Sequence, residues 1–224
     1  PKASLEFVRA VVAQWIFKSK EEIREIEAAV ATSQAMYLAA MKLAKPGRYE
    51  YEVSGTMEGI ALARGMHLAF PPIVTINGQT LHMHEHGNVL AKGRFLVMDC
   101  GAESAMGYAS DITRSVPVGG RFNRRQKDVY EIVLAGQESA IKAIKPGVNF
   151  KDIHLQAARV MAAGLKGLGL MKGAGRLWAA THGGGVALFT GTVFEPVAEG
   201  LPDLRVWQLL EGRDSSGGRR LLAA

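Results

Sequence analysis

The stretch HMHEHGNVLAKGRFLVMDCGAESAMGYASDITR, residues 82–114, decides the fold of this chain. Two short apolar segments, residues 95–98 and 116–118, flank a polar connection that contains glycines. Apolar runs of this length on either side of a turn-rich segment are typical of a β-hairpin. Asp99 would then leave one strand and Asp111 would enter the next. Two carboxylates are therefore expected at neighbouring strand ends, where they could share a cation.

Three histidines alternate just before this hairpin, at His82, His84 and His86. In an extended chain all three would share one face, so a three-histidine zinc site is one interpretation. The Cα atoms of the outer two would lie roughly 13 Å apart, which is too far for a single tetrahedral ion. His84 and His86 are better interpreted as structural or surface groups.

The composition is that of an ordinary soluble globular protein of one domain or slightly more, with 224 residues, 48% hydrophobic and 21% charged. Its one cysteine, Cys100, excludes an intramolecular disulfide and fits a reducing cytoplasm. We interpret Cys100 as a small buried residue rather than a nucleophile. No apolar run approaches a membrane span and no signal peptide pattern is present, so we expect a cytoplasmic protein without a membrane partner.

The formal charge of +6 raises the question of nucleic acid. The basic residues are scattered, with only Arg124-Arg125 and Arg219-Arg220 as adjacent pairs, and no ladder of aromatic residues is interleaved with them. A solvated surface is the better account, and we expect no nucleic-acid partner.

Upstream of the hairpin, the pattern predicts two helices after an apolar segment. Residues 5–16 are apolar and partly β-branched, which favours a strand or an extended linker. Ser19 and Glu22 form a capping box that begins a helix of about residues 19–44, and a second helix, weakened by three glycines, is expected over about 50–66. After them, residues 73–84, with Asn77-Gly78 at the turn, resemble another hairpin.

Downstream of residue 118, the same order of helices recurs. A buried apolar stripe between Val129 and Ile144 predicts one helix, and a second is expected over about residues 150–170. A Lys-Pro-Gly sequence separates the two helices of each pair, at 45–47 and at 145–147. This order indicates an internal repeat, so a second ligand-bearing hairpin would follow residue 170.

The chain changes character instead from Gly173 onward, where glycines are frequent and no lysine follows Lys172. We find no sustained helical or strand period there, so residues 173–224 are predicted to be loop or a weakly ordered tail. Our hypothesis is that a shifted reading frame or an alternative end replaced the original segment. The expected organisation is a linker or the end of a missing N-terminal domain over 1–17, a catalytic domain over 18–172, and the atypical tail.

Several motifs together resemble the pita-bread-fold metallopeptidases, and within them the Xaa-Pro aminopeptidase and Xaa-Pro dipeptidase branch. The likeness covers roughly residues 14–172. The most specific of these motifs is Ser110-Asp111-Ile112-Thr113-Arg114, and the others are Lys18 to Glu22, Thr80-Leu81-His82, Asp99 to Glu103 and Lys145-Pro146-Gly147.

The resemblance implies an α/β pita-bread (creatinase/aminopeptidase-like) fold, here with an incomplete or altered C-terminal part. It also implies two divalent metal ions, Mn²⁺ first with Zn²⁺ or Co²⁺ as alternatives, held by five ligands. Asp99 and Asp111 match the first two ligands, and His82 matches a catalytic histidine that contacts substrate. The family's other three ligands, one histidine and two glutamates, are not identifiable, because His182-Gly183-Gly184-Gly185 is only a partial match to the histidine motif.

The implied function is metal-dependent release of the N-terminal residue before proline, from a peptide substrate with proline at its second position. With three ligands unassigned, we expect the activity of this chain to be impaired. One alternative is an inactive pita-bread protein that binds peptides or acts as a scaffold, and another is a related creatinase or methionine aminopeptidase. A homo-oligomer is left open.

Overall fold

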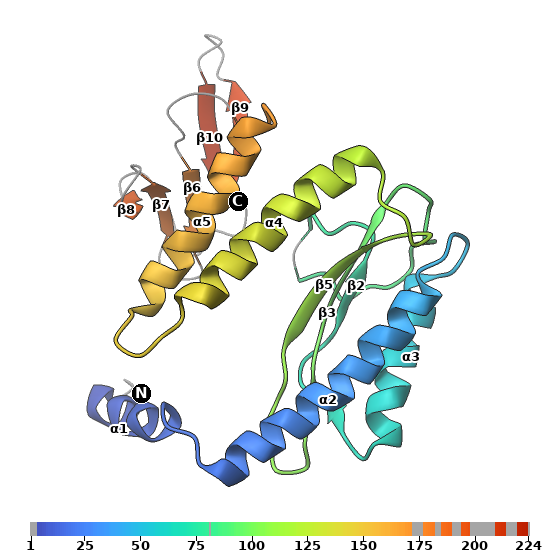
Figure 1. Ribbon diagram of the computed structural model, residues 1–224, viewed down its shortest axis with the longest axis vertical. Helices are drawn as coiled ribbons and strands as arrows, with labels where there is room; N and C mark the ends of the chain where they lie inside the picture. The colour runs from blue at the N-terminus through green and yellow to red at the C-terminus, as the bar shows by residue number, and fades with distance from the viewer. Residues whose placement is uncertain are drawn as a thin grey trace. The chain divides into compact units, whose positions relative to one another are not determined.

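The computed structural model describes residues 4–80 and 82–171 with their side chains (Figure 1). Beyond them it describes the backbone of five strands, at 177–181, 185–189, 194–197, 209–213 and 219–223. The chain divides into two compact units, Pro1–Asn123 and Arg124–Ala224. The mixture of helices and sheets agrees with the α/β class expected from the sequence.

The described residues of the first unit form three helices and five strands. The helices are α1 (Leu5–Trp15), α2 (Lys20–Leu43) and α3 (Glu50–Ala63). The strands are β1 (His67–Leu68), β2 (Ile73–Thr75), β3 (Phe95–Cys100), β4 (Ala102–Glu103) and β5 (Ile112–Pro117). Strands β2, β3 and β5 form an antiparallel sheet in that order, and β1 pairs with β4. Helices α2 and α3 pack together beside this sheet (Figure 1).

The core of the first unit lies between the helix pair and the sheet. Met36 and Met57 from the helices meet Val74, Leu96 and Met98 from the sheet, and all five side chains are fully buried. Strand β3 alternates buried residues with half-buried ones along its length. This alternation directs every second side chain away from the core, and Asp99 belongs to the outward set.

Helix α2 begins as the capping box predicts. The Ser19 hydroxyl accepts from the Glu22 amide at 3.2 Å, and the Glu22 carboxylate accepts from the Ser19 amide at 2.6 Å. That amide and the Tyr108 hydroxyl, which donates to Glu22 at 3.0 Å, lower the pKa of the Glu22 carboxyl. The helix therefore has a fixed N-terminal end that also contacts the loop before Asp111.

Two predictions for the first unit are wrong. Residues 5–15 form helix α1 rather than a strand or an extended linker. The Ser4 hydroxyl accepts from the Phe7 amide and caps this helix. The prediction considered only the apolar residues 5–16 and not the capping serine before them. Thr80 and residues 82–84 form no strand, and β2 pairs with β3 instead, so the predicted hairpin around Asn77-Gly78 is absent from the described residues.

Tyr37 of α2 connects this helix to the hairpin of β3 and β5 through its hydroxyl. Its hydroxyl lies within hydrogen-bond distance of the carbonyls of Met98, at 3.2 Å, Cys100, at 3.4 Å, and Ile112. Burial raises the pKa of this hydroxyl far above its usual range, so it remains a donor. One side chain thus contacts both strands of the hairpin, at the residues that follow Asp99 and Asp111.

We expect Tyr37→Phe to lower the free energy of unfolding by about 1–3 kcal/mol, because buried carbonyls lose their donor. Tyr51→Phe is the matched control: its side chain is exposed, and the change should fall within about 0.5 kcal/mol. Urea unfolding followed by circular dichroism measures both. Equal stabilities for the two variants would contradict this account of Tyr37.

The second unit contains helices α4 (Arg124–Ala143) and α5 (Phe150–Gly167), which pack against each other. A Cβ atom at Gly164 would come within 2.7 Å of Ile132, so this glycine permits the close approach of the helices. The Lys-Pro-Gly sequence at 145–147 separates them as predicted.

Backbone strands follow α5. Strands β6 (Leu177–Thr181), β7 (Gly185–Phe189) and β8 (Phe194–Val197) form an antiparallel sheet, and β9 (Leu209–Arg213) pairs with β10 (Arg219–Ala223). These five strands lie where a loop or a weakly ordered tail was predicted, because short runs can pair with one another without a long period. The rest of 173–224, including most of His182-Gly183-Gly184-Gly185, lies outside the described residues. Within the described part of the chain, no helix is long and apolar enough to cross a membrane.

Candidate active site

The predicted hairpin is present, and it brings Asp99 and Asp111 together. Asp99 is the next-to-last residue of β3, and Asp111 immediately precedes β5. The register pairs Asp99 with Thr113, and the Thr113 hydroxyl donates to the Asp99 carboxylate at 2.7 Å. The strand order and register therefore place both carboxylates at the same end of the hairpin.

The two carboxyl groups interact with each other. Partial loss of water around Asp111 raises the pKa of its carboxyl, and the charge of Asp99 and a hydrogen bond with Asp99 raise it further. Two neighbouring carboxylates repel each other when both are ionised, and a bound cation offsets this repulsion. Oxygen ligands of this kind suit Mn²⁺ and borderline ions.

The pair fits part of a divalent metal site rather than a whole one. Two neighbouring ions need several negative ligands to offset their mutual repulsion. Among the described residues, no group of three or more His, Cys, Asp or Glu side chains gathers closely enough to hold a metal. The described residues thus bring together two of the expected ligands, Asp99 and Asp111, and place no third His, Cys, Asp or Glu side chain with them.

A buried hydroxyl network holds the hairpin end in place. Ser33 of α2 and Ser110 share a hydrogen bond of 2.7 Å, and both hydroxyls lie close to the Ala102 amide, at 3.1 and 3.0 Å. The Ser110 amide in turn donates to the Ala102 carbonyl at 2.9 Å. This network holds Ser110, the residue before Asp111, against Ser33 and Ala102. Sequence reasoning missed this role because the two serines are far apart in the chain.

His82 lies on the long connection between β2 and β3, away from the hairpin in sequence. It is exposed, and its φ of 55° makes it the one residue other than glycine with positive φ in the described part of the chain. His84 is exposed, and the His86 ring lies 3.2 Å from the Pro72 carbonyl. These placements agree with surface and structural roles for His84 and His86.

Cys100 is fully buried between Asp99 and Gly101, as the sequence interpretation of a small buried residue predicts. Burial raises the pKa of its thiol to about 12. Because the thiolate is the reactive form, we expect a thiol reagent at pH 8 to modify the native chain roughly 100-fold or more slowly than the unfolded chain. Rapid modification of the native chain, measured by absorbance, would contradict the buried position.

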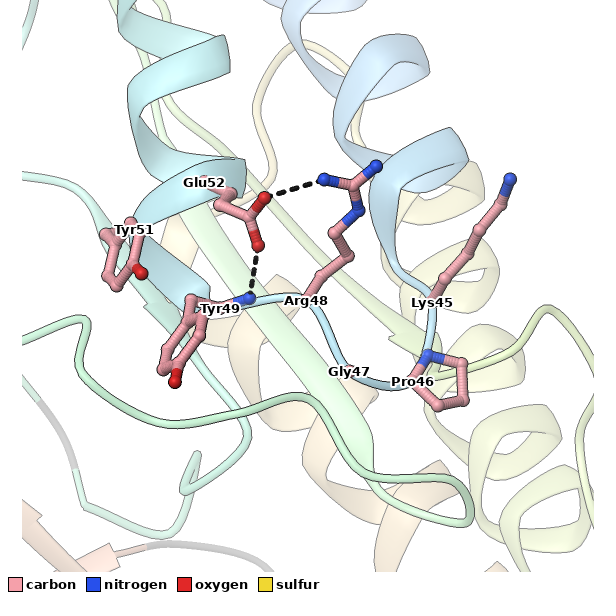
Figure 2. A pocket seen from close by; sticks show the side chains of 7 residues that line it. All are labelled: Lys45, Pro46, Gly47, Arg48, Tyr49, Tyr51 and Glu52. Atoms are coloured by element: carbon pink, nitrogen blue, oxygen red, sulfur yellow. Dashed lines mark hydrogen bonds and ion pairs between the residues drawn. The ribbon is translucent and has the colours of Figure 1, made fainter.

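The α2–α3 connection borders a pocket of about 590 Å³ (Figure 2). The side chains that line it are those of Lys45, Pro46, Arg48, Tyr49, Tyr51 and Glu52. The two tyrosine rings stack with their centroids 4.8 Å apart, and Arg48 pairs with Glu52 at 2.7 Å. Neither aspartate of the hairpin lines this pocket, so it is separate from the carboxylate pair.

Comparison with known proteins agrees with the arrangement of helices and hairpin. A model of metallopeptidase family M24 matches residues 24–194, which extends beyond the 14–172 of the resemblance. The Xaa-Pro aminopeptidase of Escherichia coli K12 is 32% identical over 178 residues, covering 77% of this chain and 40% of that protein.

Solved structures give the same result. Aminopeptidase PepP of Pseudomonas aeruginosa matches with a TM-score of 0.69 and 34% identity, over 71% of this chain and 37% of that one. Zn-substituted E. coli aminopeptidase P in complex with product matches with a TM-score of 0.68 and 32% identity, over 70% and 36%. This chain thus spans about two fifths or less of the length of these relatives. The expected pita-bread fold is confirmed over that shared region, and the chain belongs to metallopeptidase family M24.

Proposed function

We propose that this chain is an aminopeptidase-type metallohydrolase that releases the N-terminal residue before proline. In this proposal Asp99 and Asp111 hold divalent metal, and His82 contacts the peptide substrate. The observation that carries the proposal is the contact between the two carboxyl groups at neighbouring strand ends, in a chain of metallopeptidase family M24. The similarity to Xaa-Pro aminopeptidases supports a substrate with proline at its second position.

The carboxylate pair suits Mn²⁺, with Zn²⁺ or Co²⁺ as alternatives. The Zn-substituted E. coli structure supports zinc as an accepted ion in a relative. A divalent ion held by Asp99 and Asp111 would supply Lewis-acid polarisation of the scissile carbonyl. The chain's own contribution is to orient its ligands: the Thr113 hydroxyl fixes one oxygen of Asp99, and Ser110 fixes the backbone before Asp111.

His82 is proposed to hydrogen-bond the peptide near the bond that breaks. An imidazole can donate or accept at either ring nitrogen, so it can bind a carbonyl oxygen or an amide. Its left-handed backbone supports a functional position, because strained conformations of this kind are concentrated at binding and catalytic sites.

We further propose that turnover by this chain alone is slow. The resemblance implies three more ligands, a histidine and two glutamates, and no residue of the chain is assigned to them. The buried free thiol of Cys100 supports a reducing, cytoplasmic location for the proposed enzyme.

An assay of two matched peptides tests this function. We expect the purified chain with Mn²⁺ to release alanine slowly from Ala-Pro-Ala and not from Ala-Ala-Ala, and a chelator should abolish the release. Faster cleavage of a methionine peptide, or hydrolysis of creatine, would assign the chain to another branch of the fold. Binding of Ala-Pro-Ala without turnover at any metal concentration would favour an inactive peptide-binding protein.

A further inference from the structure

Glu50, the first residue of α3, carries a carboxylate that is completely buried. One oxygen accepts from the Ile76 amide at 2.7 Å. The other accepts from the Asn88 side chain at 2.9 Å and lies 3.3 Å from the Asn88 amide. No cation pairs with Glu50 in the described part of the chain. A buried carboxylate is costly unless hydrogen bonds satisfy it, so these N–H donors account for its presence.

The two partners of Glu50 are the two ends of one segment, residues 76–88 of the chain between β2 and β3, which we call the His82 connection. Ile76 is the first residue after β2, Asn88 is the last residue of the segment, and His82 is at the midpoint between them. Backbone bonds join the same far end to the first turn of α3: the Glu50 amide donates to the Asn88 carbonyl and the Tyr51 amide to the His86 carbonyl, both at 3.0 Å. Glu50 therefore ties both ends of the His82 connection to one helix terminus.

Each end has further support of its own. Arg94 donates to the Ile76 carbonyl at 2.8 Å and to the Asn77 side chain at 2.9 Å, which fixes the near end. The Leu90 amide donates to the Arg48 carbonyl at 2.7 Å, which fixes the far end. Among these contacts, the Glu50 side chain is the one that joins the two ends to each other.

The position of His82 depends on such support. A left-handed backbone at a residue other than glycine is uncommon and persists only where the surrounding structure determines it. His82 has this backbone at the exposed centre of the connection, and the connection is held at its ends. We propose that Glu50 is a positioning residue, which fixes His82 through the connection between Ile76 and Asn88. This inference rests on the proposed function, in which His82 contacts the peptide.

Glu52 provides a matched control, because it lies in the same helical turn and acts only locally. Its carboxylate accepts from the Tyr49 amide and from Arg48, both at 2.7 Å (Figure 2). Those contacts cap α3, and the Glu52 side chain itself makes no hydrogen bond to residues 76–88 in the described part of the chain. If Glu50→Gln altered His82 only by weakening the start of α3, Glu52→Gln should alter His82 as well.

The test compares Glu50→Gln with Glu52→Gln in the full chain by NMR and amide hydrogen exchange. Glutamine offers one acceptor where Glu50 offers two, and its NH₂ group would face an N–H donor. We expect Glu50→Gln to shift or broaden the His82 imidazole resonances and to speed exchange at Ile76 and Asn88 roughly tenfold or more. Glu52→Gln should leave these signals at their wild-type values. Unchanged His82 resonances in folded Glu50→Gln, or equal changes in both variants, would overturn the inference.

If Glu50→Gln does not fold, Asn88→Ala is the milder variant, since it removes one contact of the carboxylate and keeps the backbone. It should shift the His82 resonances in the same direction, and wild-type resonances in this variant would overturn the proposal.

Hydrolysis of Ala-Pro-Ala separates this inference from the proposed function. His82→Ala and the double variant His82→Ala/Glu50→Gln should have equal kcat/KM values, because Glu50 acts through His82. A further loss in the double variant would contradict the positioning role. An unchanged kcat/KM in His82→Ala would contradict the proposed role of His82, while the NMR comparison still decides whether Glu50 fixes its position.

Discussion

Replacement of Asp99 with asparagine is expected to abolish the stabilisation that Mn²⁺ gives the wild-type chain. A metal that binds only the folded state adds about 2.7 kcal/mol to the free energy of unfolding when its free concentration is about 100 times its Kd. An amide is a weaker ligand than a carboxylate and carries no charge. Because changes beyond the first ligands already cost about 10–100-fold in affinity, loss of a ligand itself should cost at least about 100-fold.

Asp111→Asn should give the same loss of the Mn²⁺ effect without loss of metal-free stability. Asp99 and the partial burial of Asp111 both raise the pKa of the Asp111 carboxyl, so the ionised pair repels itself in the folded chain. Removing one charge should leave the metal-free protein at least as stable as wild type. This variant therefore separates loss of metal from loss of fold.

Glu103→Gln is the matched control for both variants. Glu103 lies on β4, next to the hairpin, and we assign it no ligand role. Thermal unfolding with and without Mn²⁺ should give this variant the wild-type response. If Asp99→Asn and Asp111→Asn also keep the full response to Mn²⁺, the metal lies elsewhere in the chain.

Gly101→Ala is expected to have the largest effect on the fold. A Cβ atom at Gly101 would overlap the backbone carbonyl of Ser110, and the Phe70 ring lies 3.2 Å from the same point. Backbone atoms cannot move aside as a flexible side chain can, so β3 and the segment before Asp111 must separate. Backbone displacement would also break the bonds of Ser110 to Ala102. We expect a loss of about 3 kcal/mol or more, comparable to the largest single-residue effects.

The same substitution elsewhere should have the opposite sign. Gly59 is an exposed residue within α3, and nothing lies within 4 Å of a Cβ atom built there. Alanine favours a helix over glycine by about 0.5–1 kcal/mol, so Gly59→Ala should stabilise the chain. Urea unfolding of both variants measures the contrast. A Gly101→Ala variant as stable as wild type would contradict the close packing of the hairpin end.

Local chemistry explains which parts of the fold could be predicted. The capping box of Ser19 and Glu22 and the Lys-Pro-Gly breaks mark helix ends within a few residues, and α2, α4 and α5 appear where these signals place them. The hairpin of β3 and β5 follows from two apolar runs around a turn, so the contact of Asp99 with Asp111 needed no knowledge of distant residues.

The failures arise where distant residues decide the outcome. Residues 80–84 alternate like a strand, but β3 takes β2 as its partner and Glu50 holds the connection that follows. The Ser33–Ser110 bond joins side chains 77 positions apart, so no local pattern could reveal it. Ser4 caps the helix over residues 5–15, but the β-branched residues of that segment favoured a strand or linker in the sequence interpretation.

The most direct test of the central claim, that Asp99 and Asp111 form a metal site, is electron paramagnetic resonance of Mn²⁺ titrated into the full chain. The account predicts that the wild-type chain removes the signal of free Mn²⁺ and that Asp99→Asn leaves this signal at its protein-free intensity. Equal removal of the free signal by the wild-type and Asp99→Asn chains would contradict it.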